Sequence, residues 1–395
     1  MSKFKGGLFL KVVLAIVCGA LLGIVAPEWT VRILKTFNVL FAQLLKFIIP
    51  LLILGLVTPA IANVGRGAGK MLLSVLVIAY CSTICAGFFT HVSVSGLFPH
   101  YLTPGELSTD IMSAKEFTPY FDIKIPPVCD ILTALVLSFM IGVGIIFTGS
   151  SALKKAFDEF GAIIKLTIGK VVIPLLPWYI FSMICEMSAK GVISVILGAG
   201  FKIILTGIVL SVIYLIIQYC IAGALAGKNP FKCLWNMTPA YLTAFSVCSS
   251  SAVIPVTSEC TRKNGVSDDI VNFTIPLCST VHMCGSTIKL ATSAIAVAYL
   301  SGIDLPFGVY ASFVMMQGIA AVAAPGVMGG VLMASVGLLE TILGFSPEMT
   351  ALTMTIYLAL DGYGPACNVT GDGAIAIVIE KIYGARRKTE ENSSL

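Results

Sequence analysis

Charged side chains are scarce in this sequence of 395 residues: Lys, Arg, Asp and Glu together make up 11% of it. A soluble globular domain carries about 25%. Hydrophobic residues reach 57%, and the mean hydropathy is +0.97. This composition excludes an ordinary water-soluble enzyme, a disordered chain and a nucleic-acid-binding protein, and it predicts a polytopic membrane protein with the lipid bilayer as its surroundings.

The sequence also lacks the residue patterns of a metal centre, a disulfide framework or an active site. Its twelve Cys stand mostly singly in apolar stretches, as Cys18 and Cys185 do, and no Cys-x-x-Cys pair occurs. The three His (His91, His100 and His282) are scattered, and no nucleophile–base pair with an orienting group is visible. We therefore expect neither an enzyme nor a bound cofactor.

Apolar runs fill the first part of the chain. Crossing about 30 Å of hydrocarbon takes about 20 residues. Six runs approach or exceed this length: Leu8–Val25, Val39–Ala62, Met71–Phe98, Ile131–Phe147, Ile163–Met187 and Val192–Ala226. Polar segments at His100–Asp130 and Gly149–Asp158 are expected as connections. The first run is read as a retained helix, because many apolar runs follow it and Ala26–Trp29 is a poor cleavage context.

The second part of the chain contains apolar runs that polar clusters interrupt. Ser246–Ser251 breaks one run, which Pro255 closes, and Ala323–Gly330 breaks another. Long helices are expected after them, at Val271–Leu300 and Met349–Ile382. Non-helical backbone at membrane depth is tolerated only against protein or a water-filled cavity, so the two broken runs predict re-entrant hairpins around a binding site.

Topology follows from the basic residues at both ends. Lys3, Lys5 and Lys11 precede or begin the first run, and Lys381 and Arg386–Lys388 follow the last. Both termini are therefore expected in the cytoplasm, which requires an even number of spans. Six plain helices and two late ones give eight transmembrane helices, to which the two re-entrant hairpins are added in this all-α fold.

Two carboxylates and an amide lie in the last apolar run, at Asp361, Asn368 and Asp372. Their spacing places them near one helix face. Charge at membrane depth is costly and is kept chiefly for function, although two structural aspartates are the alternative. Pro365 is expected to break this helix and to free carbonyls that can ligate a hard cation.

A second polar stripe runs through Cys278, His282, Ser286 and Lys289 at helical spacing. The alternatives are a packing role for His282, and snorkelling or a structural ion pair for Lys289. A third feature, the hydroxyls of Ser249–Ser251 at the tip of the first hairpin, would suit a carboxylate.

These motifs resemble the dicarboxylate/amino acid:cation symporter family, which includes glutamate transporters and bacterial serine/threonine symporters. The similarity extends from the first helix through Leu44–Pro50 to the last. Thr243–Val256 looks like the family's first hairpin, and Pro276–Ser286 occupies the place of its seventh-helix Asn-Met-Asp-Gly-Thr motif. Ala323–Gly326 looks like the tip of the second hairpin, and Asp361–Asp372 looks like the eighth-helix motif.

The resemblance implies a glutamate-transporter-like elevator fold assembled as a homotrimer. Residues 1–228 would form the scaffold and trimerisation region, with helices three and six bordering the core. Residues 229–384 would form the transport core, and 385–395 a cytoplasmic tail. The compact length suggests a bacterial inner (plasma) membrane.

The resemblance also implies roles for individual residues. Asp361 would take the ammonium of an amino acid, and Asn368 and the serine tip would take its carboxylate. The implied substrate site comprises Ser249, Ser250, Ser251, Met283, Ser286, Lys289, Ala324, Asp361, Gly364, Pro365 and Asn368. Sodium would bind at Asp372 with carbonyls of Cys278, His282 and Asn368, and at carbonyls of Thr280, Ile319 and Ala321 beside Met283.

Departures from the family pattern bear on the substrate. Where members that carry acidic substrates have Arg in the eighth helix, this sequence has Gly364, and Cys248 replaces the Arg that others place in the first hairpin. A guanidinium is the natural partner of a second carboxylate, so a small neutral amino acid such as serine, threonine or alanine is expected. The alternative is an acidic amino acid or a C4-dicarboxylate, with Lys289 as its carboxylate partner.

The seventh-helix motif also departs from the family pattern, because His282 stands in place of its Asn and Cys284 in place of its Asp. In the family these positions serve a third sodium site, together with helix-three hydroxyls that correspond here to Tyr80 and Thr83. Without the carboxylate, we expect this site to be lost or filled by His282 and Lys289. Fewer sodium ions would then be coupled, with a proton on His282 as a further coupling ion. A channel remains a competing hypothesis, although it would favour a ring of charge or carbonyls around a pore.

Overall fold

A computed structural model describes residues 7–64, 70–107, 117–129, 131–191, 193–323, 329–359 and 361–384. Within these ranges the regular structure is helical throughout, and no strand occurs. The predicted runs of the first part appear as α1 (Gly7–Val25), α2 (Glu28–Val64), α3 (Lys70–Leu97), α5 (Ile131–Thr148), α6 (Ser151–Thr167), α7 (Ile173–Ala189) and α8 (Ile193–Ala226). The predicted tail at 385–395 lies outside the described residues, as do Lys3 and Lys5.

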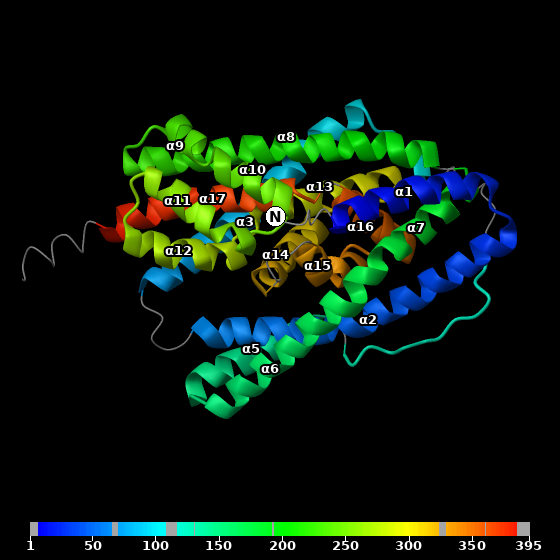
Figure 1. The fold of residues 1–395 in the computed structure, drawn as a ribbon, viewed down its shortest axis with the longest axis horizontal. Helices are drawn as coiled ribbons and strands as arrows, with labels where there is room; N and C mark the ends of the chain where they lie inside the picture. Colours follow the sequence, from blue (N-terminus) through cyan, green and yellow to red (C-terminus); the bar gives the residue numbers. More distant parts are fainter. Residues whose placement is uncertain are drawn as a thin grey trace, which may run out of the picture.

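The helices pack in two groups. One group contains α1, α2, α5, α6 and α7. In this group α1 packs on α7, and α2 packs on α5, α6 and α7. In the other group α3 and α8 lie against the helices of the second part of the chain (Figure 1). The predicted domain boundary at residue 228 remains a prediction, because packing within one chain does not show which group moves.

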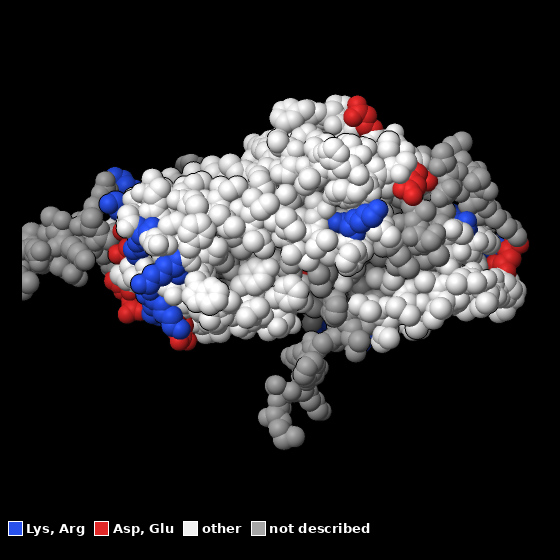
Figure 2. Space-filling model, turned by 90° about the horizontal axis from the view of Figure 1, so that it is seen from above, with Lys and Arg blue, Asp and Glu red and all other residues white. Residues whose placement is uncertain are grey.

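The outer surface is largely apolar. Large hydrophobic side chains such as Leu21, Ile24 and Phe201 are more than 60% exposed. Figure 2 shows charged side chains mainly toward the two ends of the molecule, with a wide area between them that carries few. At the end near α11 and α12 they include ion pairs such as Arg262–Asp268. This distribution is the one expected of a protein that spans a membrane.

Three helical segments among the described residues are long and apolar enough to cross a membrane: Lys70–His100, Gly198–Ala226 and Asp268–Leu300. A fourth results if the bent pair Ser151–Val172 and Pro177–Ala189 counts as one span. The total of eight spans therefore remains a prediction.

The region from 149 to 189 differs from the prediction of a polar connection followed by one straight run. Only Gly149, with φ of +69°, and Ser150 separate α5 from α6, so most of the predicted connection is helical. A π-helical turn at Ile168–Val172 then leads into α7, and the helix axis bends by 46°. Proline explains the bend, because Pro177 lies inside α7 and cannot donate a helical hydrogen bond.

The first broken run forms a helical hairpin. After the short α9 (Pro230–Asn236), α10 (Thr238–Val247) ends at Cys248, which adopts the left-handed conformation with φ of 54°. A 3-10 turn at Ser251–Val253 leads into α11 (Ile254–Lys263), which packs back on α10. The second broken run forms α14 (Phe307–Ala323) and α15 (Gly330–Thr341), which also pack together. The intervening residues 324–328 lie outside the described ranges.

The two long helices predicted after the hairpins are each interrupted, which was expected near Pro365 in the second but not at His282 in the first. The first consists of α12 (Asp268–Val281) and α13 (Cys284–Leu300), with His282 extended between them at φ −100° and ψ 104°. The second consists of α16 (Pro347–Ala359) and α17 (Tyr363–Ile379). Both breaks free backbone groups in the protein interior, where polar side chains must satisfy them.

Candidate functional site

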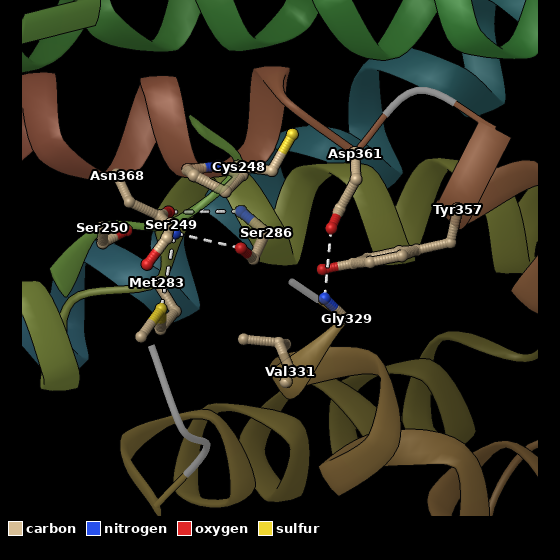
Figure 3. A pocket seen from close by; sticks show the side chains of 12 residues that line it. Cys248, Ser249, Ser250, Met283, Ser286, Gly329, Val331, Tyr357, Asp361 and Asn368 are labelled. Carbon is tan, nitrogen blue, oxygen red and sulfur yellow. Dashed lines mark hydrogen bonds between the residues drawn. The ribbon is translucent and has the colours of Figure 1, made fainter. Parts of the chain in front are cut away.

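A buried cavity lies where hairpin α10–α11, the α12–α13 break, the start of α15 and the α16–α17 break meet. Its polar side chains are those of Ser249, Ser250, Ser286, Tyr357, Asp361 and Asn368. The rest of the lining comes from Cys248, Met283, Gly329, Gly330, Val331 and Pro365. Figure 3 shows Asn368, Ser286 and Met283 grouped on one side, with Asp361, Tyr357 and Gly329 on the other.

Asn368 on α17 caps the start of α13. Its Oδ1 accepts hydrogen bonds from the backbone N–H groups of Gly285 at 2.8 Å and Ser286 at 3.2 Å. Its Nδ2 donates to Ser286 Oγ at 3.0 Å and Met283 Sδ at 3.4 Å (Figure 3). The first N–H groups of a helix have no partner within the helix, so this one amide joins both broken helices beside the cavity.

Asp361 is 2% exposed and has two different partners. Its Oδ1 forms an ion pair with the ammonium of Lys289, which is fully buried on α13. Its Oδ2 accepts a hydrogen bond at 3.1 Å from the backbone N–H of Gly329, the residue directly before α15 (Figure 3). The carboxylate therefore connects α13 to the second hairpin.

A second buried polar contact joins His282 to Asp372. His282 Nδ1 lies 2.9 Å from Asp372 Oδ1, and both side chains have no exposed surface. On its other side, His282 Nε2 lies 3.0 Å from Ser82 Oγ on α3, which also accepts from Gln218 of α8 at 2.7 Å. Asp372 Oδ2 has no hydrogen-bond partner within the described residues. One buried carboxylate oxygen is thus available for a cation.

The predicted substrate residues only partly line the cavity. Ser249, Ser250, Met283, Ser286, Asp361, Pro365 and Asn368 do so. Lys289 and Gly364 lie behind this lining, where a Cβ added at Gly364 would be 3.5 Å from Lys289 Cδ. Ser251 is in the turn that follows the lining serines, and Ala324 lies outside the described residues.

The predicted sodium ligands fall on three helices and one break. Cys278 and Thr280 lie near the end of α12, Ile319 and Ala321 near the end of α14, and Asp372 on α17. The carbonyl of Cys278 accepts a hydrogen bond from the N–H of His282 at 2.8 Å. Of the two helix-three residues, Thr83 accepts from the N–H of Met283 at 3.3 Å, whereas Tyr80 donates to Met315. These roles as ligands remain predictions.

Sequence reasoning missed Tyr357, Gly329, Ser82 and Gln218. Tyr357 and Gly329 line the cavity, while Ser82 and Gln218 surround His282. A polar Gln218 in an otherwise apolar helix was a usable signal, because polar side chains inside a span face protein or a cavity. Ser82 had no such signal, since a serine bonded to its own helix is common in a span.

The cavity carries little net charge. Among the described residues of its lining, Asp361 is the one acidic side chain, and Lys289 pairs with it from behind. The other polar side chains are hydroxyls and an amide. Backbone N–H groups at the start of α13 and α15 lie beside them. Such a lining suits a small solute that carries both an ammonium and a carboxylate.

Broken helices whose ends meet at a buried polar site, within a largely apolar exterior, define an integral membrane protein of the secondary-transporter class. The chain belongs to the sodium:dicarboxylate symporter family, whose model matches residues 8–382.

Curated relatives of this chain are serine/threonine transporters named SstT. The one from Streptococcus suis (strain 05ZYH33) is 28% identical over 340 residues, which cover 83% of this chain and 93% of that one. The one from Lacticaseibacillus casei (strain BL23) is 25% identical over 338 residues, which cover 82% and 77%.

Proposed function

We propose that this protein is a sodium-coupled symporter of a small neutral amino acid such as serine, threonine or alanine. The observation that carries the proposal is the charge-balanced cavity, in which Lys289 already pairs with Asp361. The relatives that bear the name serine/threonine transporter support the same substrate class.

The lining offers complementary groups for both ends of an amino acid. Asp361 would accept the ammonium, and its Oδ2 becomes available if the Gly329 N–H turns away. The amide of Asn368 and the hydroxyl of Ser250 would donate to the carboxylate. Ser286 and Met283 would then contact the side chain of the amino acid.

A second carboxylate would find no free cation in the described lining. Lys289 is fully buried and is held by Asp361, so its ammonium is already paired. Binding such a substrate would require Lys289 to leave not only Asp361 but also the rings of Tyr357 and Tyr363, which its ammonium contacts. Competition by aspartate is therefore the outcome that would favour the acidic alternative.

Sodium is the proposed second solute. The free Oδ2 of Asp372 is a hard anionic ligand without a partner among the described residues, and carbonyl oxygens of Cys278, His282 and Asn368 would complete its surroundings. A second ion would lie at carbonyls of Thr280, Ile319 and Ala321 beside Met283. Each ion would raise the affinity for amino acid, and amino acid would raise the affinity for the ion by the same factor.

Movement would follow the elevator scheme of alternating access. The group of α1, α2, α5, α6 and α7 would be the static scaffold of a homotrimer, and the helices around the cavity would move against it. The second hairpin would serve as the gate, because Gly329, between α14 and α15, already contacts Asp361. We place the protein in a bacterial inner membrane with both termini in the cytoplasm.

The test is uptake of labelled serine by the purified protein in liposomes with an inward sodium gradient. We expect uptake that requires sodium and that unlabelled aspartate does not inhibit. Strong inhibition by aspartate would reassign the substrate, and uptake driven by a pH gradient without sodium would reassign the coupling ion. Absence of uptake under every gradient would refute the transport proposal.

A further inference from the structure

We propose that Lys289 is a built-in counter-cation that pairs with Asp361 whenever no amino acid is bound, so that the empty protein can return across the membrane. This inference rests on the proposed function and adds the mode of transport. The protein would catalyse net movement of amino acid, whereas a carrier that cannot return empty is limited to exchange.

The ammonium of Lys289 is buried in the protein. Lys289 is the sixth residue of α13, and it is fully buried along with almost all of that helix. Its Nζ contacts both the Oδ1 and the backbone carbonyl of Asp361, the latter at 3.3 Å. A lysine that snorkels would extend to the membrane surface, whereas this one ends at the carboxylate that lines the cavity.

Two aromatic rings contact the same ammonium while it pairs with Asp361. Nζ lies 3.6 Å from the centroid of the Tyr357 ring and 5.5 Å from that of Tyr363. Cation–π attraction at a desolvated site is substantial. These ring contacts would remain when another ammonium replaces Lys289 at Asp361, so Lys289 would not become an isolated buried charge.

An amino acid and Lys289 would then alternate at one carboxylate. With substrate bound, Asp361 pairs with the substrate ammonium, and without substrate it pairs with Lys289. In both forms the buried carboxylate has a cationic partner. Removing one member of a buried ion pair is strongly destabilising, so a protein without the lysine could move readily only with amino acid bound.

The experiment compares net efflux with exchange in one set of liposomes. Full-length protein is reconstituted, the liposomes are loaded with labelled serine, and sodium is equal on both sides. Efflux is measured into medium without serine and into medium with unlabelled serine. For the wild type we expect the two rates to be comparable.

Three variants test the role of the charge. Lys289→Met nearly preserves side-chain volume, and we expect its net efflux to fall about 10- to 100-fold relative to its exchange. Lys289→Arg keeps a cation and should retain more net efflux than Lys289→Met. Lys155→Met is the matched control, since Lys155 on α6 is 78% exposed, and it should behave as the wild type.

The outcomes separate this inference from the proposed function. A wild type that exchanges serine without net efflux overturns the inference but supports transport. An unchanged ratio in Lys289→Met also overturns it, and so does loss of exchange in a Lys289→Met protein that elutes as a folded species. If that variant does not fold, the wild-type ratio and the Lys289→Arg ratio decide. A wild type that neither exchanges nor releases serine refutes the proposed function instead.

Discussion

Asn368 gives a prediction in which structure and binding can be separated. Its Oδ1 accepts from two backbone N–H groups at the start of α13, and its Nδ2 faces the cavity through Ser286 and Met283. Asn368→Ala removes both functions. Asn368→Asp keeps two acceptor oxygens for the N–H groups but places a negative charge where we propose that the substrate carboxylate binds.

The expected magnitudes differ between the two variants. A buried donor without a partner costs about 1–3 kcal/mol, so two orphaned N–H groups in Asn368→Ala should lower stability by about 2–6 kcal/mol. In Asn368→Asp the helix N-terminus stabilises the carboxylate by about 0.3–1 kcal/mol. Two carboxylates about 4 Å apart repel by about 4 kcal/mol at an effective dielectric constant of about 20, which weakens serine binding about 1000-fold.

The assay combines thermal unfolding in detergent with calorimetric titration of serine. Asn229→Ala is the matched control, because Asn229 caps the short surface helix α9 through Lys232 N at 3.0 Å. If Asn368→Ala melts at the same temperature as Asn229→Ala, the capping argument is refuted. If Asn368→Asp binds serine as the wild type does, Asn368 does not hold the substrate carboxylate.

Three further predictions test neighbouring features. Gly285→Ala should lower stability by about 1–3 kcal/mol, because its Cβ would lie 2.5 Å from the carbonyl oxygen of Gly364 on α17. The control Gly144→Ala should not lower stability, because no neighbouring atom lies within 4 Å of the added Cβ. Equal melting temperatures of the two variants would show that α13 can shift freely. Gly364→Arg alone should reduce serine uptake without allowing aspartate uptake, since the new side chain starts beside the stem of Lys289. The double variant with Gly364→Arg and Lys289→Met should transport aspartate. Aspartate uptake by the single variant would contradict this reasoning. Asp372→Asn should raise the sodium concentration for half-maximal uptake, because it removes the charge on the unpartnered Oδ2, and an unchanged value would exclude Asp372 as a sodium ligand.

Much of the architecture was predictable from local sequence. Long apolar runs specify buried or lipid-facing helices by composition alone, and the serine cluster at 246–251 correctly predicted the turn that Cys248 makes at the end of α10. The breaks inside the two late helices were less visible. Pro365 did indicate an interruption near Asp361, but nothing between Val281 and Cys284 is a helix breaker, so the extended His282 was not foreseen.

The sequence by itself determined that this chain lies in a membrane, that it bends back on itself twice, and that Asp361, Asn368, Asp372, His282 and Lys289 require partners there. Only the tertiary structure decided which partners they have. Lys289 pairs with an aspartate 72 positions away and His282 with one 90 positions away. Either cation could have met either carboxylate, or the cavity, because helical spacing fixes a side chain's face but not the neighbouring helix that packs against it. That choice depends on close approaches such as Gly285 against Cys367, which arise only when distant helices pack together.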